Sequence, residues 1–157
     1  MGFKPRIGIQ MIRALVASLL VLECSNHSIG ATAWVGGPFT VVMTTPITHV
    51  GESFSGSSDL PLAHDAQCSV SVSAATPGSE VLKSAGGSTL TTHYKVTGIA
   101  DGDGAWVDST TFLSHTYTVP GNNITTNLTL WVQGTAPADR APEAGVYTAT
   151  VIITASF

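Results

Sequence analysis

The acidic segment Asp101-Gly102-Asp103-Gly104, with Asp108 close behind it, holds the densest group of oxygen ligands in this sequence. Carboxylates at alternate positions could bind Ca²⁺, but a calcium loop of the EF-hand type also needs further oxygen ligands and a closing glutamate at fixed spacing. The segment lacks both. Because Asp-Gly pairs are typical of turns, we interpret it as the turn of a hairpin.

The histidines that could bind a metal or act as bases are His49, His64, His93 and His115, and each stands alone. No two of them lie two or four residues apart, as the paired histidines of zinc motifs do. Gly-x-Ser-x-Gly elbows, phosphate loops and paired inward-facing carboxylates are also missing from the sequence. We therefore expect no enzymatic activity, no catalytic residues, no metal site and no cofactor. A secreted hydrolase whose catalytic residues meet only in the fold remains an alternative.

Two tryptophans are candidates for binding sugars. Trp106 falls on an expected turn, and Trp131 falls on the outward phase of an expected strand. Indole rings on a surface can stack on sugar rings, but packing or contact between subunits is the more common role of such residues.

Cys68 is the only cysteine after residue 33. It is in phase with Val70 and Val72 in an alternating segment, which favours a buried core thiol over a reactive one. A lone cysteine also excludes an intrachain disulfide, so the stability of the domain must come from packing.

The composition indicates one domain with an apolar core. The chain has 157 residues, of which 43% are hydrophobic and 10% charged, which is too apolar for a disordered chain. Three of the six basic residues, Lys4, Arg6 and Arg13, precede an apolar run near the N-terminus. Nine acidic and three basic residues follow residue 33, a net charge of −6. Without clustered cations, nucleic acid is excluded as a partner.

The first 33 residues have the layout of a secretory signal peptide. A basic start is followed by an apolar run over 14–22 and by Ala31-Thr32-Ala33, a small-residue cleavage site. The apolar run is shorter than the roughly 20 residues of a membrane-spanning helix, so we expect no retained membrane anchor. Translation from Met11 and cleavage after Gly30 remain open, and neither would change the fold.

The rest of the sequence predicts an all-β fold, an Ig-like β-sandwich, because short alternating runs are bounded by Gly, Pro, Asn and Asp and none has helical spacing. Gly51 to Pro61 reads as a spacer that is not placed on a strand. The predicted strands are 39–44, 67–74, 89–97, 111–119, 124–133 and 145–157, with a doubtful piece at 47–50.

The last thirty residues are the most specific part of the sequence. Pro142-Glu143-Ala144-Gly145-Val146-Tyr147 leads into an alternating strand that closes on Phe157. With a signal peptide and an alternating segment directly after it, this pattern resembles pilin subunits of the bacterial chaperone-usher pathway. The disulfide-free colonisation-factor pilins and the spore-coat-U-like pilins are the nearest types. The disulfide that many such pilins contain is absent.

The resemblance implies an incomplete sandwich that is completed by a donor strand from another molecule. Its domains would be a signal peptide (1–33), an N-terminal donor-strand extension (34–47) and an Ig-like pilin domain (48–157). The acceptor strand, which also binds the chaperone, would present Tyr147, Ala149, Val151, Ile153 and Phe157. The donor strand would present Phe39, Val41, Met43, Thr45 and Ile47, which lie at alternate positions.

The expected function is therefore that of a secreted fimbrial subunit, which polymerises by donor-strand exchange into a surface fibre used for adhesion or biofilm formation. Its partners would be a periplasmic chaperone, an outer-membrane usher and identical or related pilin subunits, and it would pass through the periplasm to the cell surface. Two alternatives stay open. Residues 39–44 could be the first strand of a complete sandwich, and the protein could be a self-sufficient secreted carbohydrate- or surface-binding module.

Overall fold

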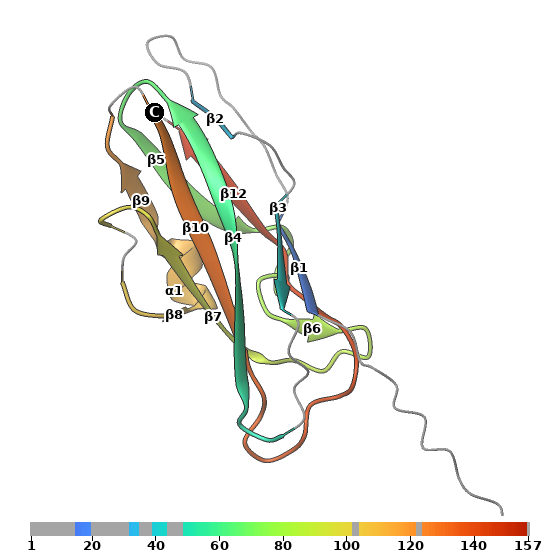
Figure 1. Cartoon of the computed structure of the whole chain (residues 1–157). Helices are drawn as coiled ribbons and strands as arrows, with labels where there is room; N and C mark the ends of the chain where they lie inside the picture. The colour runs from blue at the N-terminus through green and yellow to red at the C-terminus, as the bar shows by residue number, and fades with distance from the viewer. Residues whose placement is uncertain are drawn as a thin grey trace, which may run out of the picture.

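Antiparallel strands make up almost all the regular structure of this chain, as Figure 1 shows. The structure is a computed structural model that describes residues 15–19, 32–34, 39–43, 49–101, 104–121 and 124–156. The predicted all-β class is confirmed for these residues, which contain one short helix, α1 (Ser109–Ser114). No helix in the described ranges is long and apolar enough to cross a membrane.

The largest sheet has the strand order β2-β4-β10-β7-β8. Its centre is the pair β4 and β10, which run antiparallel over twelve residues each. The bounds of its strands are β2 (Thr32–Trp34), β4 (Ser53–His64), β10 (Ile124–Thr135), β7 (Thr91–Thr97) and β8 (Val107–Asp108).

A second sheet has the order β12-β5-β9, so β12 (Val151–Ser156) and β9 (Thr116–Val119) are its edges and β5 (Cys68–Ala74) its centre. Two small pairs complete the described strands. The pair β1 (Leu15–Leu19) and β3 (Phe39–Met43) is antiparallel, and so is the pair β6 (Lys83–Ser84) and β11 (Tyr147–Thr148).

The alternating faces of the two larger sheets share one hydrophobic core. Leu128, Leu130 and Val132 of β10 are buried, whereas Thr129 and Trp131 between them are partly exposed. The same alternation buries Val151 and Ile153 of β12. Successive side chains of a strand point to opposite faces, so each strand contributes every second residue to this core.

The segment read as a spacer, Gly51 to Pro61, forms most of β4, the longest strand together with β10. Its Ser, Gly, Asp and Pro content argued against a strand. However, β4 pairs with β10 along the whole length of both strands. Phe54 fits opposite Gly134, where a Cβ would lie 2.7 Å from the Phe54 ring. The prediction was wrong because the stability of this strand comes from its partner and not from its own composition.

The predicted strand 111–119 is correct only from Thr116 onward, since α1 occupies its first part. Asp108 caps this helix by accepting hydrogen bonds from the backbone N–H and the hydroxyl of Thr111, each at 2.9 Å. Phe112 is thereby placed in the core, where it is fully buried. A six-residue helix is too short for helical periodicity to reveal it.

The predicted strand 145–157 is divided into β11 and β12. The backbone N–H of Thr150 donates to the Ser79 carbonyl, and the Ser79 hydroxyl donates to the Thr150 carbonyl at 2.8 Å, which fixes the break between the two strands. The piece doubtfully assigned to 47–50 is a turn at residues 49 and 50, while residues 44–48 lie outside the described ranges. The remaining predicted strands agree with β3, β5, β7 and β10 within two residues.

Candidate functional site

The residues predicted to form the acceptor strand lie on β11 and β12 and, for Ala149, between them. Tyr147, Ala149, Val151 and Ile153 are all buried, and Phe157 lies outside the described residues. β12 pairs with β5 on one side. On its other side no described strand forms a ladder with it, although β1 and β2 come close. The outer edge of β12 is therefore a place where a further strand could add.

The residues predicted to form the donor strand begin in β3. Phe39, Val41 and Met43 belong to this strand, whereas Thr45 and Ile47 lie outside the described residues. Val41 is 1% exposed and is part of the core. β3 pairs with β1 and packs beside β4, and β1 contacts β11 and β12 (Figure 1). The pair β1 and β3 thus lies between β4 of the largest sheet and β12 of the second sheet.

The partner of β3 within this chain is β1, whose residues 15–19 belong to the predicted signal peptide. Val41 stands opposite Ala17 in this pair. Cleavage after Ala33 would remove β1 and leave β3 without its hydrogen-bonded neighbour. The same cleavage would remove the segment that contacts β11 and β12.

Cys68 is 2% exposed at the start of β5, so the predicted burial of this thiol is confirmed. Burial raises the pKa of the Cys68 thiol, because it disfavours the charged thiolate. A protonated and covered thiol is a poor nucleophile.

His64 and His115 have different partners within the described part of the chain. His64 is buried, and its ring nitrogens lie 3.0 Å from the Ala66 carbonyl and 2.7 Å from the Thr126 hydroxyl. His115 lies 3.8 Å from the Asp101 carboxylate. Within the described ranges no three His, Cys, Asp or Glu residues are grouped in a way that could hold a metal ion.

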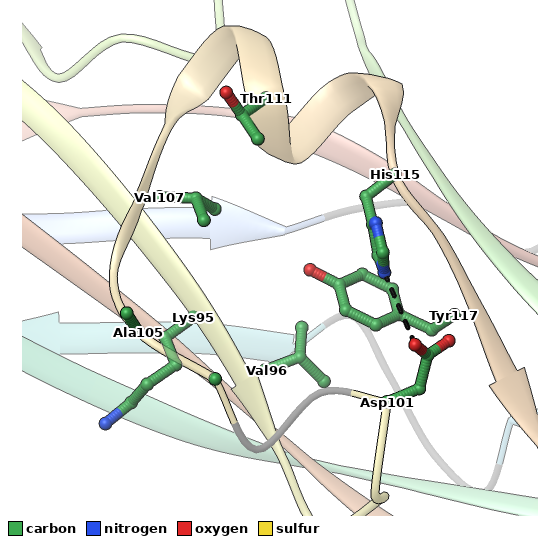
Figure 2. Close-up of a pocket in the computed structure, with 9 residues that line it drawn as sticks. Lys95, Val96, Asp101, Ala105, Val107, Thr111, His115 and Tyr117 are labelled. Atoms are coloured by element: carbon green, nitrogen blue, oxygen red, sulfur yellow. Dashed lines mark ion pairs between the residues drawn. The ribbon is translucent and has the colours of Figure 1, made fainter.

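A cavity of about 130 Å³ lies between β7, α1 and β9, under the loop that joins β7 to β8 (Figure 2). Val96, Val107 and Tyr117 give it apolar walls, and Asp101, Thr111 and His115 stand at its rim. Burial, with a smaller contribution from the Asp101 carboxylate, raises the pKa of Tyr117 to about 12. Its phenol is therefore protonated at neutral pH and can donate a hydrogen bond, but it is no base.

The loop over this cavity contains the Asp-Gly segment interpreted as a hairpin turn. β7 and β8 on its two sides pair antiparallel, which agrees with a hairpin connection, and Gly102 and Asp103 lie outside the described residues. Asp101 accepts a hydrogen bond from the backbone N–H of Thr118 at 2.9 Å. The Asp101 carboxylate thus ties this loop to β9.

The two tryptophans proposed as sugar platforms meet across Lys95. Its Nζ lies 5.0 Å from the Trp106 ring centroid and 5.1 Å from that of Trp131. The stem of Lys95 lines the cavity, while its ammonium group points away from Tyr117 in Figure 2. Lys95 was missed in the sequence because only the register of β7 against β10, which sets it opposite Trp131, reveals the contact.

Comparison of the chain with protein-family models and with curated proteins finds no match.

Proposed function

We propose that this protein is a secreted fimbrial subunit of the chaperone-usher type, with an Ig-like sandwich that is completed by a strand from another molecule. The observation that carries the proposal is the position of β12. This strand has buried inward residues and a ladder to β5 on one side, and it lacks a ladder on the other side within the described residues.

An unpaired edge beside a hydrophobic core favours the addition of a strand. Main-chain hydrogen bonds to the edge would supply affinity, and alternate side chains would set the register. Val151, Ile153 and Ala155 provide apolar contacts at the required period of two. Each apolar side chain that a donor buried there would contribute about 1.5–3 kcal/mol.

β3 is the segment best suited to act as donor. It is extended, it alternates, and its hydrogen-bonded partner β1 belongs to residues that we expect to be removed on export. After cleavage, β3 would be free to leave its own body and add to another. Because the donor and acceptor surfaces differ, the contact is head-to-tail and extends into a filament instead of closing into a ring.

Deletion of residues 34–46 from the exported chain tests this function. We expect the variant to keep its complex with the chaperone, since the acceptor strand is intact, and to lose detergent-resistant multimers and fibres seen by electron microscopy. Continued multimer formation by the deletion variant would refute donor-strand exchange through this segment.

One observation favours a second candidate, a complete and self-sufficient secreted binding module. β3 lies within its own chain here, with Val41 in the core. A complete module would be a stable monomer after signal cleavage and without any chaperone. A fimbrial subunit prepared in the same way would aggregate or self-associate, so size-exclusion chromatography separates the two functions.

A further inference from the structure

A row of three side chains crosses the outer face of the largest sheet. Trp131 in β10 stands directly opposite Lys95 in β7. On the other side of β7, Tyr94 pairs with Val107 of β8, so Trp106, which immediately precedes β8, lies beside Lys95. The ammonium group of Lys95 lies within about 5 Å of both ring centroids. One cation is therefore held between two partly exposed indoles.

Among the described residues, no carboxylate forms an ion pair with Lys95. Lys95 is one of only three basic residues after residue 33. The acidic groups on the neighbouring strands bond elsewhere. Asp59 accepts from the Thr129 hydroxyl at 2.9 Å, and Asp108 accepts from Thr111. The ammonium hydrogens of Lys95 are thus available to an anion from outside.

The surroundings of this row suit a polyhydroxylated ligand. The indole N–H of Trp131 donates to the Thr97 hydroxyl at 3.0 Å, which fixes the orientation of the ring before any ligand arrives. Ser57 of β4 stands opposite Trp131, and Gln133 lies two residues after Trp131 on the same face of β10. Neither side chain has a hydrogen-bond partner among the described residues, so both could bind hydroxyl groups.

We propose that Trp106, Lys95 and Trp131 form a binding site for an acidic saccharide. The sugar rings would stack on the indoles, a carboxylate would bind Lys95, and Ser57 and Gln133 would take hydroxyl groups. Neighbouring strands lie about 4.8 Å apart, so the two tryptophans stand on backbones about 10 Å apart, close to the length of a disaccharide. A single cation between aromatic rings matches a sugar acid better than a nucleic acid, which requires several cations.

This inference does not rest on the proposed function. The row lies on the outer face of the largest sheet, whereas the strand-addition edge is β12 of the other sheet. Loss of polymerisation with retained saccharide binding, or the reverse, would therefore separate the two proposals.

The test titrates the exported full-length protein with trigalacturonic acid and, as a matched ligand, with its methyl ester, which keeps the sugar rings and removes the charge. Tryptophan fluorescence and calorimetry report binding. We expect the acid to bind about tenfold more tightly than the ester at low salt, and this preference to shrink as ionic strength rises.

Lys95→Met keeps the apolar stem and removes the charge, so it should weaken binding of the acid about tenfold and leave binding of the ester within about twofold. Arg140→Gln is the control, because it changes the net charge equally at an exposed residue outside the row. It should change neither affinity by more than about twofold. Trp106→Ala, which alters no strand, should weaken binding of both ligands about three- to tenfold.

Equal binding of acid and ester by the wild-type protein, independent of salt, would overturn the assignment to acidic sugars without any variant. If neither ligand binds at millimolar concentration, Trp106, Lys95 and Trp131 only pack against one another and form no saccharide site. If Lys95→Met does not fold, as judged by circular dichroism, the salt dependence and Trp106→Ala decide the outcome.

Discussion

The rings of Tyr94 and Phe112 stack face to face, with centroids 4.4 Å apart and planes 8° apart. Tyr94 comes from β7 and Phe112 from α1, so this contact joins the helix to the largest sheet. Both residues are at most 1% exposed. The Tyr94 hydroxyl donates to the Glu80 carbonyl, and burial, followed by the charge of Glu80, raises the Tyr94 pKa well above its usual value.

Phe112→Ala should lower the free energy of unfolding by about 3–5 kcal/mol, because it leaves a cavity where the ring stacked on Tyr94. Leu113→Ala, at a partly buried neighbour, should cost clearly less. Urea unfolding followed by circular dichroism measures both values. Similar costs for the two variants would contradict a core role for Phe112.

Asp108 should make stability depend on pH in the acid range. Hydrogen bonds from the Thr111 backbone N–H and hydroxyl lower the Asp108 pKa below its ordinary value of 3.8. A folded pKa below the unfolded one stabilises the protein above the unfolded pKa, and this contribution is lost as pH falls through the folded value. Asp108→Asn keeps an oxygen acceptor but does not titrate.

The thermal midpoint of the wild-type protein should therefore exceed that of Asp108→Asn at neutral pH, and the difference should shrink as the pH falls below about 4. Other carboxylates titrate in both proteins and cancel in the comparison. A difference that is constant across this range would show that the Asp108 charge does not stabilise α1.

Cys68 should be inert in the folded protein, since it is buried and its pKa is raised. In a Cys24→Ser variant, which leaves Cys68 as the only thiol, a disulfide reagent at pH 8 should label the chain only in proportion to its unfolding by urea. Rapid, complete labelling in the absence of urea would refute the core position of this thiol.

Ile153 and Ile152 offer a matched pair on the proposed acceptor strand. Ile153 is 5% exposed and faces the core, whereas Ile152 is partly exposed on the other face. Ile153→Asp should abolish both co-purification with the chaperone and multimer formation, because both would use the apolar face of β12. Ile152→Asp should retain both. Equal behaviour of the two variants would argue against β12 as the acceptor.

Val41 and Val42 offer the corresponding pair in β3. Val41→Asn should reduce detergent-resistant multimers and leave the chaperone complex intact, because the chaperone would supply its own strand to the acceptor. Val42 is out of phase with Val41 in an alternating strand, so Val42→Asn should have the smaller effect on multimers. Loss of multimers to the same extent in both variants would contradict a donor strand in this register.

Some of this fold could be predicted from short segments alone. The alternation in Leu128 to Val132 and in Val151 to Ala155 specifies strands with one buried face, since the period of two is a property of the extended backbone itself. The burial of Cys68 followed from the same phase. These predictions were right because the pattern and its cause lie within a few residues of each other.

Other features depended on partners that are distant in the chain. The polar segment of β4 becomes a strand because β10 pairs with all of it. The helix α1 forms because the Asp108 cap and the Tyr94 ring stabilise its six residues. The row of Trp106, Lys95 and Trp131 arises from the register between three strands. The sequence by itself determined which residues alternate, and hence the all-β class. Only the tertiary structure decided which strands are neighbours, because the hydrogen bonds and contacts that select a neighbour form between segments whose local patterns are alike.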